Sequence, residues 1–212
     1  MKTKFLLSVL LFMSFFANSQ NVFDKADTVN YPYDKWTAEE IQIATTTMDA
    51  VYLNDTERAV VILANLTRTN PGLFSKTFLL QYVTDNDLLS NSNVKSLQKT
   101  LRRLKPLHAF IPDKKIYELA KSHAIYSGKK GRVGHQNFSK RSRSSGYGYF
   151  AENCQYGYDE AMDIFMELLI DDGVPSLGHR LNFISPDTRY IGVSLQPHKR
   201  YEYNCVIDFG GN

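Results

Sequence analysis

The chain has 212 residues, which is enough for one well-cored domain with an appendage and too few to favour two full domains. Its formal net charge is +3, and it falls to +1 when residues 1–19 are removed, because Lys2 and Lys4 leave with them. A nearly neutral chain does not predict a nucleic-acid-binding protein, and no later stretch approaches the roughly 20 apolar residues of a membrane span.

Residues 1–19 have the three parts of a secretory signal peptide. Lys2 and Lys4 come first, the apolar run Phe5 to Phe16 follows, and Ala17-Asn18-Ser19 supplies small residues for cleavage. No cysteine follows this cleavage point, so the pattern does not predict a lipid anchor. We therefore expect a secreted or periplasmic/extracellular protein whose mature chain begins at Gln20.

Residues 20–52 are expected to form an N-terminal extension that contains a helix. The segment from Gln20 to Trp36 shows no sustained period and is predicted to be extended. Thr37 and Glu40 have the spacing of a capping box, in which a hydroxyl and a carboxylate three residues apart satisfy the first backbone amides of a helix. This helix is predicted to run to about Tyr52.

Several amphipathic helices are predicted before residue 128. The pair Asn54 and Glu57 begins one that ends before Pro71, and others are expected over residues 72–83, from Val94 and from Pro112. The last of these places His123 on its apolar side, which favours a core-facing histidine over a metal ligand.

The pattern changes after residue 128. Short runs with strand character occur at 149–155, 190–196 and 202–209, and a helix is predicted over 160–170. Helices followed by a helix among antiparallel strands predict an α+β sandwich rather than alternating βαβ units.

Both cysteines, Cys154 and Cys205, fall in predicted strands. Export would permit a disulfide between them. The alternative is two buried free thiols, which behave as small apolar side chains.

His135, Glu152 and His179 are the residues best suited to chemistry, because each lies beside a glycine or another small residue. Two imidazoles and a carboxylate can bind a divalent transition metal, or can act as general acid and base. The alternative is that they hydrogen-bond to one another and to the backbone, and so hold loops together.

Four ordered motifs resemble the CAP superfamily, which comprises cysteine-rich secretory proteins, antigen 5 and plant pathogenesis-related proteins, and particularly its bacterial branch. The resemblance covers roughly residues 53–212 and implies an α-β-α sandwich with a three- or four-stranded antiparallel sheet between helical layers. The motifs are Gly134-His135 with Phe138, Ala151-Glu152-Asn153, Gly178-His179-Arg180 with Asn182, and Ile191-Gly192-Val193.

In that family two histidines and two acidic residues line a central cavity that can bind a divalent cation, so the resemblance implies zinc or a similar ion as cofactor. His135, His179 and Glu152 match three of these positions. Glu167 stands one residue from the register of the fourth, and Asp171 and Asp172 are further candidates.

Other residues are expected to support the site or to line a groove. Arg180 and Asn182, with Asn153, are predicted to orient the His179 segment rather than to touch a ligand. Tyr147, Tyr149 and Tyr156 flank Glu152 and suit a groove for a small apolar or glycan ligand, and ordinary sheet packing is the alternative.

The first functional hypothesis is a secreted, non-catalytic binding module that holds a divalent cation and a lipid, glycan or protein ligand. The alternative is a metal-dependent hydrolase or peptidase in which Glu152 is the general base. A third is a purely structural or adhesive module. The sequence contains no HExxH or GxSxG motif, which gives the hydrolase little support.

Overall fold

The computed structural model describes residues 31–212. The predicted signal peptide and the first part of the predicted lead-in, residues 20–30, lie outside the described residues.

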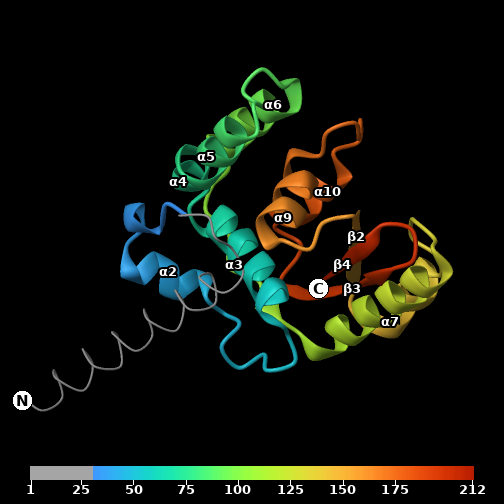
Figure 1. Ribbon diagram of the computed structural model, residues 1–212. Coiled ribbons are helices and arrows are strands. Elements are labelled where there is room, and N and C mark those ends of the chain that lie inside the picture. The colour runs from blue at the N-terminus through green and yellow to red at the C-terminus, as the bar shows by residue number, and fades with distance from the viewer. Residues whose placement is uncertain (1–30) are drawn as a thin grey trace, which may run out of the picture.

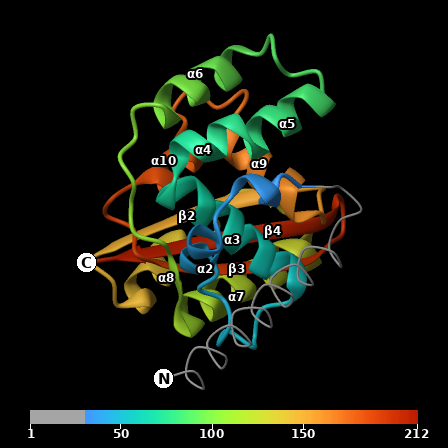
Figure 2. The same ribbon diagram turned by 90° about the vertical axis from the view of Figure 1, so that its left-hand side faces the viewer.

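A four-stranded sheet lies between two layers of helices, so the predicted α+β sandwich is confirmed (Figures 1 and 2). The strand order is β1-β3-β4-β2. The three long strands are antiparallel, whereas β1 has two residues and runs parallel to β3. The strands are β1 (Ile111–Pro112), β2 (Tyr149–Tyr156), β3 (Tyr190–His198) and β4 (Glu202–Gly211).

One layer of helices covers one face of the sheet. It consists of the long helix α7 (Lys114–Lys130) and the shorter α8 (Phe138–Ser145) (Figure 2). Two glycines permit close packing of α7 on the sheet, because a Cβ at Gly192 would stand 2.3 Å from the Tyr117 backbone nitrogen and one at Gly128 would stand 2.1 Å from the Pro197 carbonyl oxygen.

The other layer holds most of the apolar core. Phenyl rings connect its elements, with centroids 4.9 Å apart for Phe165 and Phe183 and 5.4 Å apart for Phe183 and Phe209. Such edge-on aromatic contacts stabilise the core beyond the area they bury. The helices of this layer and of the N-terminal half are η1 (Tyr33–Lys35), α2 (Ala38–Ala44), α3 (Asp55–Thr69), α4 (Pro71–Lys76), α5 (Phe78–Asp85), α6 (Ser92–Leu101), α9 (Ala161–Ile170) and α10 (Gly178–Ile184).

The predicted N-terminal helix begins as expected and ends early. Thr37 and Glu40 form the capping box at the start of α2, but the helix stops at Ala44 rather than near Tyr52. The β-branched run Thr45 to Thr47 disfavours helix. The backbone there is bonded instead by α3, through Asn65 Nδ2 to the Ala44 carbonyl at 2.8 Å and Arg58 Nη1 to the Thr47 carbonyl at 2.6 Å.

Two further boundaries differ from the prediction. The helix expected over 72–83 is divided into α4 and α5 at Thr77, whose ψ of −91° is not helical. The stretch after His135, in which the sequence pattern predicts no helix, contains the helix α8.

Candidate functional site

The centre of the site is Glu152 on β2. Its side chain is fully buried, and it lies directly opposite Asp208 on β4 in the strand register. Side chains of paired residues project to the same face of a sheet. That face is covered by α7, from which His123 approaches to 3.8 Å between its Nε2 and Glu152 Oε1.

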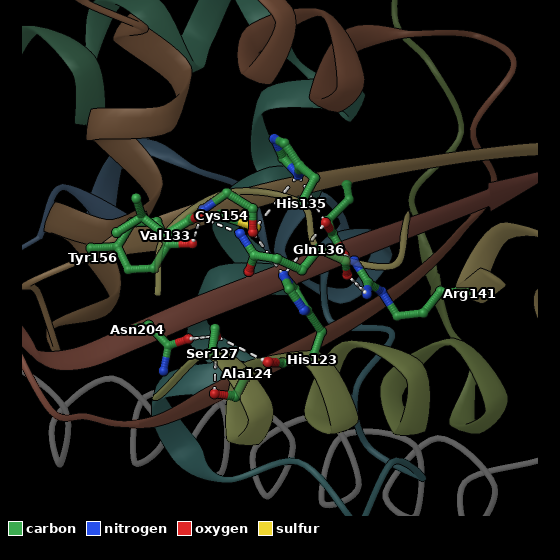
Figure 3. Close-up of polar contacts among 12 residues, drawn as sticks. His123, Ala124, Ser127, Val133, His135, Gln136, Arg141, Cys154, Tyr156 and Asn204 are labelled. Carbon is green, nitrogen blue, oxygen red and sulfur yellow. Dashed lines mark hydrogen bonds and ion pairs between the residues drawn. The ribbon is translucent and has the colours of Figure 1, made fainter. Parts of the chain in front are cut away.

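Both carboxylate oxygens of Glu152 are held by neighbouring donors. His135 Nδ1 lies 2.8 Å from Oε1. Arg141 of α8 donates to Oε2 through Nε at 3.0 Å and through Nη2. Figure 3 shows His135 and His123 entering this region from opposite sides, with Arg141 beside them. The carboxylate therefore connects α7, α8 and β2.

The two facing carboxyls have opposite pKa shifts. Burial raises the pKa of Asp208 well above its ordinary value, and the nearby charge of Glu152 raises it further. Burial also opposes ionisation of Glu152, but a hydrogen bond from His135, the nearby His123 ring and the charge of Arg141 together lower its pKa below the ordinary value. We therefore assign the single negative charge of the pair to Glu152, while Asp208 keeps its proton.

His123 belongs to this cluster, although the sequence pattern favoured a core position. It is 2 % exposed, and burial lowers its pKa, so the ring is neutral near pH 7. Its Nε2 lies 3.0 Å from the Gly134 carbonyl, while Nδ1 has no hydrogen-bond partner among the described residues. One feature of the sequence could have indicated this polar contact of His123. The small residues Ala120 and Ala124 lie on the same face of the helix and leave room for it.

The thiol of Cys154 completes the cluster, 3.7 Å from His135 Nδ1. Within the described part of the chain, one ligand atom each from His123, Glu152 and Cys154 lie within 4.8 Å of one another. Between residues 31 and 212, this is the group of three such side chains whose ligand atoms lie that close together. Burial raises the pKa of the Cys154 thiol well above its ordinary value.

The disulfide alternative is wrong, because Cys154 and Cys205 are both free. Cys154 packs with Ala120 and Ala124 under α7, whereas Cys205 packs into the main core on the other face of the sheet. Cys154 pairs with Val206 in the register, and neighbouring residues of a strand face opposite ways. The two thiols are therefore separated by the sheet.

His179 lies in the first turn of α10 rather than in a loop, and it is held by Asp171. The His179 Nδ1 to Asp171 Oδ1 distance is 2.8 Å. Asp171 adopts the left-handed conformation at the end of α9, with φ of 59°, and its Oδ2 accepts the Arg180 backbone N–H at 3.1 Å. Asp171 thus joins the end of α9 to the start of α10.

The residues expected to brace His179 contact the backbone around it. Asn153 Nδ2 donates to the His179 carbonyl at 3.0 Å, and Asn182 Nδ2 donates to Asn153 Oδ1 at 2.7 Å. The Arg180 guanidinium is buried and donates to the carbonyls of Leu169, Ile170 and Asn93 and to Ser96 Oγ. These bonds fix the backbone that carries the imidazole.

The two predicted histidines share one arrangement. In each, Nδ1 lies 2.8 Å from a fully buried carboxylate, which is Glu152 for His135 and Asp171 for His179. Because an ionised carboxylate only accepts hydrogen bonds, Nδ1 must carry the proton. In both rings the Nε2 lone pair is then directed away from the carboxylate. The His135 side chain is 48 % exposed and that of His179 is 26 % exposed.

Two other acidic candidates take different places. Burial raises the pKa of Glu167, while the nearby Gln155 side chain and the charge of His179 oppose this rise. Asp172 accepts from Asn91 Nδ2 at 2.8 Å on the exposed surface. Asp171 is therefore the acidic residue that contacts His179.

The three predicted groove tyrosines contact different neighbours. The Tyr147 ring lies tilted against that of Tyr190, with centroids 5.1 Å apart, and Tyr149 packs against the main core. The Tyr156 hydroxyl accepts the Gly134 N–H at 2.8 Å. A cavity of about 230 Å³ opens elsewhere, between α7 and α8, and both His123 and Arg141 line it. Another of about 240 Å³ lies between α5 and α9.

Residues 31–212 contain no helix that is both long enough and apolar enough to cross a membrane.

Comparison with known proteins identifies a family. The model of the CAP family, described as the cysteine-rich secretory protein family, matches residues 96–209, which is more than half of the chain. No curated protein matches the chain in sequence.

Three solved structures are similar to part of the chain. An outer surface protein from Borrelia burgdorferi has 20 % identity and a TM-score of 0.41, over 61 % of this chain and 95 % of that one. An extracellular protein containing an SCP domain from Bacillus anthracis has 16 % identity and a TM-score of 0.38, over 57 % and 41 %. A cysteine-rich secretory protein from Staphylococcus aureus has 15 % identity and a TM-score of 0.38, over 57 % and 38 %. The match thus spans about two fifths of each of the last two proteins.

Proposed function

The chain belongs to the CAP family of cysteine-rich secretory proteins, and from this premise we propose that it is an exported, non-catalytic binding module. Its functional groups are His135 and His179, which hold a divalent cation, with zinc as the first choice. The lipid, glycan or protein ligand then binds against the outward sides of these two rings.

The observation that supports this proposal most strongly is the carboxylate behind each histidine. A histidine that binds a metal commonly donates its other ring N–H to a carboxylate, which fixes the tautomer and makes the free nitrogen a better ligand. His135 and His179 both have this arrangement, through Glu152 and Asp171. Glu152 and Asp171 then fix the orientation of the two imidazole rings through their contacts with Nδ1.

The state of Glu152 favours binding over hydrolysis. A general base needs an oxygen that can reach the attacking water. Both oxygens of Glu152 instead contact cationic or N–H donors, and the side chain is fully buried. Cys154 is also a poor nucleophile, because burial raises the pKa of its thiol and keeps it protonated.

Export is proposed from residues 1–19, whose charged start, apolar run and small residues have the order of a secretory leader. The near-neutral charge of the remaining chain favours a small-molecule or protein ligand over nucleic acid.

Zinc titration by calorimetry at pH 7.5 tests the cation site in the chain from Gln20 onwards. We expect the number of bound zinc ions to fall by one in both His135→Ala and His179→Ala, because each variant removes a ligand. Asp171→Asn should weaken the same binding by roughly 10- to 100-fold, since it removes the orienting carboxylate. The matched control is His108→Ala, which removes an exposed imidazole and should leave the titration unchanged.

Binding that is unaffected by either histidine substitution, in variants with unchanged circular dichroism, would overturn the cation site. Chelator-sensitive hydrolysis of a peptide or ester by the unmodified chain would overturn the non-catalytic part and favour the hydrolase.

A further inference from the structure

The cluster beneath α7 contains metal-ligating side chains that the proposed cation site at His135 and His179 does not use. We propose that His123, Glu152, Cys154 and Asp208 form a second, buried site for a divalent cation that accepts sulfur, nitrogen and oxygen ligands, as zinc does. It requires no atom of His179, and it would stand even if the surface site did not.

The positions of the four side chains suit a single ion. One ligand atom each from His123, Glu152 and Cys154 already lie within 4.8 Å of one another. Asp208 stands directly across from Glu152 in the strand register, so its carboxyl projects to the same face. One thiolate, one imidazole and two carboxylates would give the four-coordinate shell that zinc adopts in closed sites.

Two of these side chains have few other partners. Asp208 is fully buried, and among the described residues its oxygens have no hydrogen-bond partner other than Glu152, to which its own proton can be donated. His123 Nδ1 has no hydrogen-bond partner there either. A cation would give the Asp208 carboxylate a contact in place of its proton.

His123 faces the cluster through Nε2, which lies 3.8 Å from Glu152 Oε1 and 3.0 Å from the Gly134 carbonyl. Coordination through Nε2 would therefore move the proton to Nδ1 and replace the contact with this carbonyl.

The charges of the cluster also allow an added cation. Without it, the Glu152 carboxylate is balanced by Arg141, which donates two hydrogen bonds to it. A divalent ion brings two positive charges, and loss of the Cys154 and Asp208 protons supplies two negative ones. The buried cluster then remains neutral, which avoids the large cost of an uncompensated charge.

One of the four side chains lines a cavity. The cavity of about 230 Å³ between α7 and α8 has His123 in its lining, together with the cationic side chains of Lys140 and Arg141. The other lining residues include Ser122 and Asn137, whose polar groups suit a hydrated ion.

Cobalt(II) titration followed by absorption spectroscopy tests this site, because a cysteine thiolate bound to cobalt gives an intense near-ultraviolet charge-transfer band. We expect this band in the unmodified chain and in His179→Ala, and in His179→Ala it should saturate at one cobalt per chain. Cys154→Ser should abolish it, and Asp208→Asn should weaken cobalt binding at least tenfold. Cys205→Ser is the matched control, since it removes an equally buried thiol on the other face and should keep the band.

Two results would overturn the buried site: absence of the band at saturating cobalt in the unmodified chain, or a band that persists in Cys154→Ser. Because a thiolate is a ligand of this proposed site and not of the surface site, the band reports the buried site alone. The dependence of zinc binding on His179 reports the surface site, so failure of one proposal is distinguishable from failure of the other.

Discussion

Replacing Arg68 with methionine is expected to lower the free energy of unfolding by about 4 kcal/mol or more. Arg68 is 1 % exposed, and its charge faces backbone oxygens rather than a carboxylate. Methionine keeps the apolar stem but removes these donors, at about 1–3 kcal/mol for each buried oxygen left without one; the Ser185 carbonyl still accepts from Thr188 Oγ1 at 3.0 Å. The acceptors are the carbonyls of His108 (2.7 Å), Phe183 (2.8 Å), Ser185 (2.9 Å) and Thr188 (3.0 Å).

These bonds explain why one side chain matters so much. Arg68 extends from α3 to the segment that connects α10 to β3, and its guanidinium also lies 4.0 Å from the centre of the Phe110 ring. Urea unfolding monitored by circular dichroism measures the loss. Arg103→Met, at an exposed arginine after α6, is the control and should change stability by less than about 0.5 kcal/mol. A loss below about 1 kcal/mol for Arg68→Met would contradict this role.

Replacing Glu152 with glutamine should cost about 3–5 kcal/mol at pH 7, because it leaves the guanidinium of Arg141 buried without its counter-charge. The new amide group would also direct N–H donors at His135 or Arg141, which are donors themselves. Glu118→Gln, on the exposed side of α7, is the matched control and should be nearly neutral.

The pH dependence gives a second test of Glu152. Its pKa in the folded protein lies below the ordinary value of 4.5, so the unfolded chain takes up a proton more readily. This contribution to stability is therefore present above pH 4.5 and is lost as the pH falls below it. Urea titrations at several pH values should show the gap between Glu152→Gln and the unmodified protein narrowing on acidification. A gap that stays constant well below pH 4.5 would contradict the assigned charge.

The local features of the fold follow well from the sequence. Capping pairs at Thr37 and Asn54 identify helix starts, because the contacts lie within three residues. The end of α2 was not predictable, since it depends on side chains of α3 more than ten residues later. Strand β1 has only two residues and leaves no periodic signal.

The candidate site, like the fold, could be predicted from the sequence only in part. The motifs identify His135, Glu152 and His179 as candidates, but they do not show which side chains face one another. Asp208 reads as one polar residue between Ile207 and Phe209, and only the register of β4 against β2 places it beside Glu152. Likewise, burial of His123 was predictable from its helix face, but its neighbour Glu152 was not.

The ring nitrogens of the histidines offer the most direct test of the proposed cation site, through long-range ¹H–¹⁵N correlation spectra with and without zinc. At pH 7.5 His135 and His179 should each carry the proton on Nδ1, and zinc should shift their Nε2 signals strongly while leaving exposed His108 unchanged. A proton on Nε2 in either ring, or Nε2 signals that do not respond to zinc, would contradict cation binding by these two histidines.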